Sequence, residues 1–118
     1  MYCLEPTVSY IVITVPFHSA MQRAIHFQRH GNSFGAANEF DYERMAEAFM
    51  AAPMHADLHE CFRTTGTLDR IRLDALTLHF GVAFNVVMIR TYFIRSASEI
   101  AKSGGPAAFV ASKCAQAS

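Results

Sequence analysis

Apolar side chains recur with a helical period in the first half of the chain and with a strand period in the second half. The first stripe repeats at i, i+4, i+7 and i+8, which predicts a helix over residues 18–30. Its members are Phe17, Met21, Ala24 and Ile25. We expect Gly31 to end this helix, because glycine readily adopts the left-handed backbone found at helix ends. The polar, solvent-facing side would carry His26, Arg29 and His30.

A second helix is predicted over residues 38–52. Asn38 can cap its first turn, and Glu39 and Asp41 suit the positive end of the helix dipole. The positions that follow the helical period are Tyr42, Met45, Ala46, Phe49 and Met50. Pro53 should prevent the helix from continuing, because it lacks the backbone N–H group.

Alternation of polar and apolar residues begins near residue 58 and predicts an antiparallel meander. The expected strands span residues 58–64, 70–74, 78–84 and 86–94. Turn signals lie at 64–67 and at Asn85. The second strand alternates strictly, so we expect it to be half-buried, whereas the mainly apolar fourth strand should be central in the sheet.

The order of elements predicts one α+β domain over residues 1–118, with the helices segregated on one face of the sheet. Its parts are an extended or strand segment (1–16), a helical part (17–52), an antiparallel sheet (58–95) and a short closing helix (105–115).

Composition limits the classes of function. The chain is 52% hydrophobic and 17% charged, which argues against disorder. Ten basic and ten acidic residues give a formal net charge of zero. Binding of nucleic acid must therefore rest on a local cluster of cations and not on bulk charge.

The three cysteines Cys3, Cys61 and Cys114 are widely spaced and form no Cys-x-x-Cys pair. The odd number argues against a disulfide framework, so we expect a reducing compartment. The longest apolar run, residues 8–17, is too short to cross a bilayer, which needs about 20 residues. We therefore expect no membrane span.

Residues 26–35 contain the pattern His-Phe-x-Arg-His-Gly-x-x-Phe-Gly, which resembles the start of small bacterial nuclease domains. Such domains stand at the C-termini of polymorphic and contact-dependent toxins. A tyrosine-containing acidic helix follows in that family, as at 39–50 here, and the meander ends in Ile-Arg-Thr-Tyr-Phe, as at 89–93. A closing Phe-x-x-x-x-Cys matches Phe109 and Cys114. The resemblance is to the barnase/EndoU/colicin/RelE-like (BECR) ribonuclease group.

This resemblance implies metal-independent cleavage of RNA, often tRNA, without a cofactor, and a cognate immunity protein as partner. The chemistry needs a base, an acid and cations for the phosphate. His30 and then His26 are the acid–base candidates, since histidine titrates near neutrality. Arg90 is the candidate phosphate clamp, because an arginine in an apolar strand needs a reason to be there. Thr91 could orient the phosphate through its hydroxyl.

Further substrate contacts are expected from Arg72, Tyr92, Arg95 and Arg29. The expected site of action is the cytoplasm of a target cell, reached as part of a larger secreted toxin. The oligomeric state stays open.

Three alternatives stand beside these assignments. The chain departs from the family pattern at Thr67, Leu78 and Ile94, so the second hypothesis is an inactivated relative that serves as a protein-interaction module. The second alternative is purely structural: His26 and His30 are cations near a helix end, and Arg90 pairs with Asp74 or Glu60. A zinc site would rest on the two i, i+4 pairs His26/His30 and His55/His59, which lack the HExxH pattern.

Overall fold

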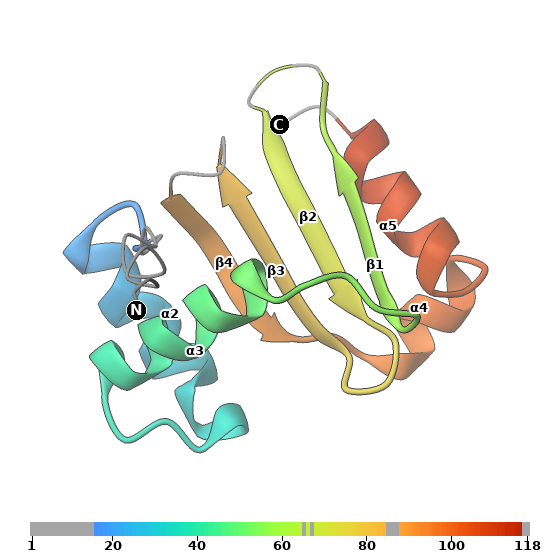
Figure 1. Cartoon of the computed structure of the whole chain (residues 1–118). Coiled ribbons are helices and arrows are strands. Elements are labelled where there is room, and N and C mark those ends of the chain that lie inside the picture. The colour runs from blue at the N-terminus through green and yellow to red at the C-terminus, as the bar shows by residue number, and fades with distance from the viewer. Residues whose placement is uncertain (1–15, 65, 67, 85–87, 117–118) are drawn as a thin grey trace, which may run out of the picture.

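The computed structural model describes residues 16–64, 66, 68–84 and 88–116. Within these residues, four antiparallel strands form one sheet in the order β1-β2-β3-β4, with two helices before it and two after it (Figure 1). The elements are α2 (Ala20–Phe34), α3 (Glu39–Ala51), β1 (Leu58–Phe62), β2 (Asp69–Asp74), β3 (His79–Phe84), β4 (Met88–Ile94), α4 (Ala97–Lys102) and α5 (Pro106–Ala115). This order confirms the predicted α+β fold class. Helix α4 was not predicted. Most of the 1–16 segment, and the turn positions 65, 67 and 85, lie outside the described residues.

Helix α2 begins where the Ser19 side chain accepts a hydrogen bond from the Gln22 N–H at 3.0 Å. The prediction that it ends at Gly31 was wrong. Gly31 is buried inside the helix, where a Cβ atom would collide with the ring of Phe27. The helix ends at Gly35, which has φ 69°, a left-handed conformation that glycine adopts without strain. Gly31 thus provides space, and the turn falls four residues later.

Helix α3 confirms its prediction closely. The Asn38 side chain accepts hydrogen bonds from the N–H groups of Phe40 and Asp41, at 3.0 and 2.9 Å. Its inward stripe consists of the fully buried Tyr42, Ala46 and Met50.

The helices lie on both faces of the sheet, so the expectation of a single covered face was wrong (Figure 1). One core cluster joins α3 and Phe17 to Ala83, Ile89 and Tyr92. The other joins α4 and α5 to Ile71, Leu73, Phe80 and Val82. Two apolar faces arise because the side chains of β3 are buried on both sides.

Two predictions about strand environment also need correction. β4 is an edge strand and not a central one, within the described residues. The outer side of β4 meets the chain just before α2: the Ile89 N–H donates to the Pro16 carbonyl at 2.7 Å, and the Ile89 carbonyl accepts from the His18 N–H at 3.3 Å. β2 is not half-buried, because α3 covers its polar face and leaves Arg72 buried.

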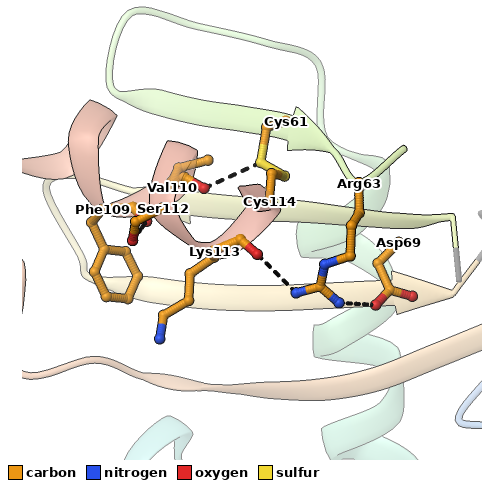
Figure 2. Close-up of a disulfide and its surroundings, with 8 residues drawn as sticks. All are labelled: Cys61, Arg63, Asp69, Phe109, Val110, Ser112, Lys113 and Cys114. Carbon is orange, nitrogen blue, oxygen red and sulfur yellow. Dashed lines mark hydrogen bonds and ion pairs between the residues drawn. A yellow bond between two sulfur atoms is a disulfide. The ribbon is translucent and has the colours of Figure 1, made fainter. Parts of the chain in front are cut away.

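Cys61 and Cys114 form a disulfide with a Cα–Cα distance of 6.3 Å (Figure 2). The prediction that these cysteines build no disulfide was therefore wrong. The two residues are 53 positions apart, and only the packing of α5 against β1 brings them together. No helix in the described part of the chain is long and apolar enough to cross a membrane.

Candidate functional site

The two predicted motifs meet where α2 packs along β4. The His30 ring stacks on the Phe93 ring with centroids 5.0 Å apart, and the His26 ring stacks on Phe17 at 5.4 Å. The two histidine rings lie 6.0 Å from each other. The prediction that these histidines face solvent was wrong, because both are half-buried against the sheet. The exposed Arg29 lies beside them on the same helix.

Burial changes the acid–base properties of this pair. It lowers the pKa of His26 to about 4, and the nearby His30, Arg29 and His18 add to the shift. Burial, together with the Arg29 charge, also lowers the pKa of His30. Both rings are therefore mostly neutral at pH 7, a state that can accept a proton. The Nδ1 atom of His26 is buried and makes no hydrogen bond to the described residues.

A cavity of about 220 Å³ lies at the start of α2 and is lined by His18, Phe84, Met88 and Arg90. The Nδ1 atom of His18 is 3.4 Å from the Ile89 carbonyl oxygen. When that nitrogen carries the proton and donates it, Nε2 is left with a lone pair. The Arg90 guanidinium lies 5.4 Å from the centroid of the Phe84 ring. A proton acceptor, a cation and an aromatic ring thus share one cavity.

His18 was absent from the predicted site. Its position beside Ser19 contains a usable signal, because a serine before an amphipathic stretch indicates a helix start. The sequence could not indicate that Phe17, just before this helix, pairs with Ile89 of β4. That bridge joins distant parts of the chain, and local patterns do not report such contacts.

Arg90 lies at a β-bulge, where the register between β3 and β4 shifts between Val82 and Ala83. Its Nε atom is 3.1 Å from Oδ1 of Asp69, a carboxylate whose side chain is only 1% exposed. The Arg90 side chain itself is 41% exposed. Arg90 therefore does pair with a carboxylate, but the partner is Asp69 and not the expected Asp74 or Glu60.

The next residue, Thr91, is partly buried and pairs with Val82 in the sheet. Within the part of the chain that the structure describes, Thr91 shares no cavity and no polar contact with the other candidate site residues.

The other predicted arginines lie elsewhere. Arg72 is buried, forms an ion pair with Glu60, and donates to the carbonyl oxygens of Phe49 at 3.0 Å and Ala52 at 2.6 Å. Arg95 packs over three aromatic rings at 4.3 to 4.8 Å, those of Phe80, Phe93 and Phe109. Neither side chain lines the cavity that holds Arg90. Their predicted contacts with substrate stay predictions.

Tyr92 lines a second cavity of about 510 Å³, near the C-terminal end of α2. Its ring stacks on Phe34 with centroids 4.2 Å apart, and His79 and Phe49 complete the aromatic lining. Burial raises the pKa of Tyr92 to about 12. This residue therefore keeps its proton at neutral pH, but it does not line the cavity of His18 and Arg90.

Among the residues that the structure describes, no group of three or more His, Cys, Asp or Glu side chains is placed to hold a metal ion. His55 precedes β1 and His59 lies within it, so this pair does not occupy successive turns of a helix.

Comparisons of the chain with protein-family models, with curated proteins and with solved structures returned no match.

Proposed function

We propose that this domain is a metal-independent endoribonuclease. Its proposed active site is the cavity lined by His18, just before α2, and by Phe84, Met88 and Arg90 of β3 and β4. The observation that carries the proposal is the shared cavity of His18 and Arg90. Arg90 belongs to the Ile-Arg-Thr-Tyr-Phe strand, which also packs against the His26–His30 motif. RNA, with tRNA as one candidate, is the proposed substrate.

The proposed reaction is transfer of a phosphoryl group within the RNA chain. Nε2 of His18 accepts the proton of the ribose 2′-hydroxyl, and the 2′-oxygen attacks the adjacent phosphorus. The bond from phosphorus to the 5′-oxygen breaks, and that oxygen takes a proton from water. The imidazolium then returns its proton to the hydroxide so formed, which leaves a cyclic 2′,3′-phosphate and a 5′-hydroxyl.

The remaining residues support this chemistry by charge and shape. The exposed part of Arg90 would stabilise the negative charge that builds on the phosphate oxygens. Phe84 offers a ring on which a base could stack. His30 and His26 serve as a second proton-accepting pair, and Arg29 as an exposed cation for the RNA backbone.

The place of action proposed for the domain is the cytoplasm of a target cell, where RNA is available. A cognate immunity protein is the proposed partner. The Cys61–Cys114 disulfide is compatible with delivery through an oxidising environment, in which such bonds form and persist.

A second candidate function is a non-catalytic protein-interaction module. One observation favours it: the candidate cations Arg72, Arg90 and Arg95 each form an ion pair with a carboxylate of the same chain. Such pairs reduce the attraction for an RNA phosphate, in a chain that has no net charge.

The test is cleavage of total tRNA and rRNA by the purified domain in EDTA, comparing wild type with His18→Gln and His30→Ala. Loss of a general base costs about 10²–10⁴ in rate, so His18→Gln should be at least about 10²-fold slower. His55→Gln is the matched control, because that side chain is 49% exposed and lies outside the cavity.

Absence of cleavage by the wild-type domain would reject the enzyme and favour the interaction module. Full activity of His18→Gln together with loss in His30→Ala would move the active site to the His26–His30 pair.

A further inference from the structure

Asp69 lies between two arginines that come from different parts of the chain. Its Oδ1 atom is 3.1 Å from Nε of Arg90, and its Oδ2 atom is 2.6 Å from Nη1 of Arg63. The carboxylate is 1% exposed, whereas the Arg90 side chain is 41% exposed. A buried carboxylate needs its partners, so Asp69 holds the inner end of Arg90 while the rest of that side chain borders the cavity.

Arg63 is in turn fixed to the last turn of α5. Its Nη2 atom donates a hydrogen bond to the Lys113 carbonyl oxygen at 2.9 Å (Figure 2). The next residue, Cys114, is bonded through its sulfur to Cys61 on β1. The disulfide therefore keeps the Lys113 carbonyl beside Arg63.

We propose that Asp69 is a positioning residue for Arg90, and that the Cys61–Cys114 disulfide fixes this residue through the Lys113 carbonyl and Arg63. The consequence for RNA cleavage rests on the proposed function, whereas the order of the Arg90 side chain does not. The disulfide-closed form holds Arg90 toward the cavity most firmly, and reduction in the cytoplasm of a target cell would loosen Arg90 and slow RNA cleavage without abolishing it.

Reduction would loosen this connection. A dithiol supplies two electrons and two protons: the S–S bond breaks, two cysteine S–H groups form, and the dithiol becomes a cyclic disulfide. The end of α5 is then held by packing and hydrogen bonds alone. The Lys113 carbonyl can move away from Arg63, and Asp69 and Arg90 lose a fixed partner.

The experiment follows the arginine Nε–H signals of the full chain by ¹H–¹⁵N NMR. The Arg90 signal is assigned by its disappearance in Arg90→Lys. In the oxidised protein its hydrogen should exchange slowly with water, because Nε–H donates to Asp69. Reduction with a dithiol, and separately Asp69→Asn, should each accelerate this exchange by about tenfold, as expected for loss of one hydrogen bond.

Arg63→Gln provides a second test that leaves the disulfide in place. It should accelerate exchange of the Arg90 Nε–H with water. If the reduced protein unfolds, as shown by loss of its far-UV circular dichroism, this variant alone tests whether Arg63 helps to fix Asp69. Arg44→Gln is the control, because Arg44 forms an exposed pair with Asp41 on α3 and should leave the Arg90 signal unchanged.

Equal exchange of the Arg90 signal in the oxidised protein, the reduced folded protein and Arg63→Gln would overturn the inference. RNA cleavage by the same samples separates the two proposals. Wild type that does not cleave RNA rejects the proposed function, and the NMR result still decides the role of Asp69. Wild type that cleaves RNA equally well before and after reduction overturns the link from the disulfide to the site.

Discussion

Two carboxylates, Glu60 and Asp69, each bind two arginines, and they lie on opposite faces of the same sheet. Glu60 pairs with Arg70 and Arg72 under the end of α3. Asp69 pairs with Arg63 and Arg90 on the side of α5. Neighbouring side chains of a strand point to opposite faces of the sheet, so Asp69 and Arg70 of β2 lie on different faces. Arg70 lies on the face of its partner Glu60.

The two clusters differ in how far their arginines are exposed. The Arg72 side chain is 5% exposed and is occupied by Glu60 and by carbonyl oxygens at the end of α3. It satisfies the C-terminal end of that helix, which favours positive charge. The Arg90 side chain is 41% exposed and borders a cavity. Similar ion pairs therefore serve the fold in one cluster and a candidate site in the other.

The largest effect is expected from removing the Glu60 carboxylate. Glu60→Ala leaves Arg72 buried without its ion-pair partner, so the free energy of unfolding should fall by roughly 3–5 kcal/mol. Urea denaturation followed by circular dichroism measures the change. RNA cleavage per folded molecule should stay at the wild-type level, because the Glu60 cluster lies away from the cavity.

The matched control is Arg44→Ala, which breaks the exposed pair with Asp41 on α3, where the Arg44 side chain is 67% exposed. It should cost less than about 1 kcal/mol. Equal losses in the two variants would mean that burial does not distinguish the Glu60 cluster from a surface pair.

The next effect concerns the disulfide on the side of Asp69. The double variant Cys61→Ser/Cys114→Ser should lower the free energy of unfolding by about 2–4 kcal/mol, because the open chain gains conformational freedom when unfolded. Native-state hydrogen exchange should show the loss of protection first in α5 and last in α3. A uniform loss over both helices would contradict the separation of the two faces.

A smaller effect follows from the pKa of His26, which burial lowers from 6.5 to about 4. The unfolded chain binds this proton more readily, so the contribution to stability is complete above pH 6.5 and decreases as the pH falls toward about 4. The contribution is on the order of 1 kcal/mol, because solvent screens the half-buried ring.

Denaturation at pH 7 and pH 5 measures this contribution. His26→Gln should show a weaker pH dependence than wild type, and His55→Gln should retain the wild-type dependence. Identical behaviour of the two variants would rule out the assigned burial of His26.

The elements with strong local signals could be predicted from the sequence. Asn38, the apolar stripe and Pro53 together define α3, because capping and helical period act over neighbouring residues. The end of α2 was predicted at the wrong glycine. The sequence does not distinguish a glycine that provides space, such as Gly31, from one that adopts a left-handed turn, such as Gly35. Which faces of the sheet are covered depends on contacts between distant segments, and local periodicity does not report them.

The candidate site was only partly predictable for the same reason. Arg90 was identified because a charged residue interrupts an apolar strand, which is a local signal. Its pairing with Asp69 depends on the register of β2, β3 and the bulge in β4, and a shift of one residue would move each side chain to the other face. The contribution of His18 depends on the contact with Ile89, and the disulfide depends on the docking of α5.

The catalytic role of Arg90 is tested by comparing RNA cleavage by wild type and Arg90→Ala in EDTA, at concentrations of folded protein matched by circular dichroism. The rate for Arg90→Ala should fall by about 10² or more, because the variant loses the charge that stabilises the phosphate oxygens. The same assay should show Arg44→Gln at the wild-type rate. Cleavage by Arg90→Ala at the wild-type rate would mean that Arg90 does not take part in the reaction.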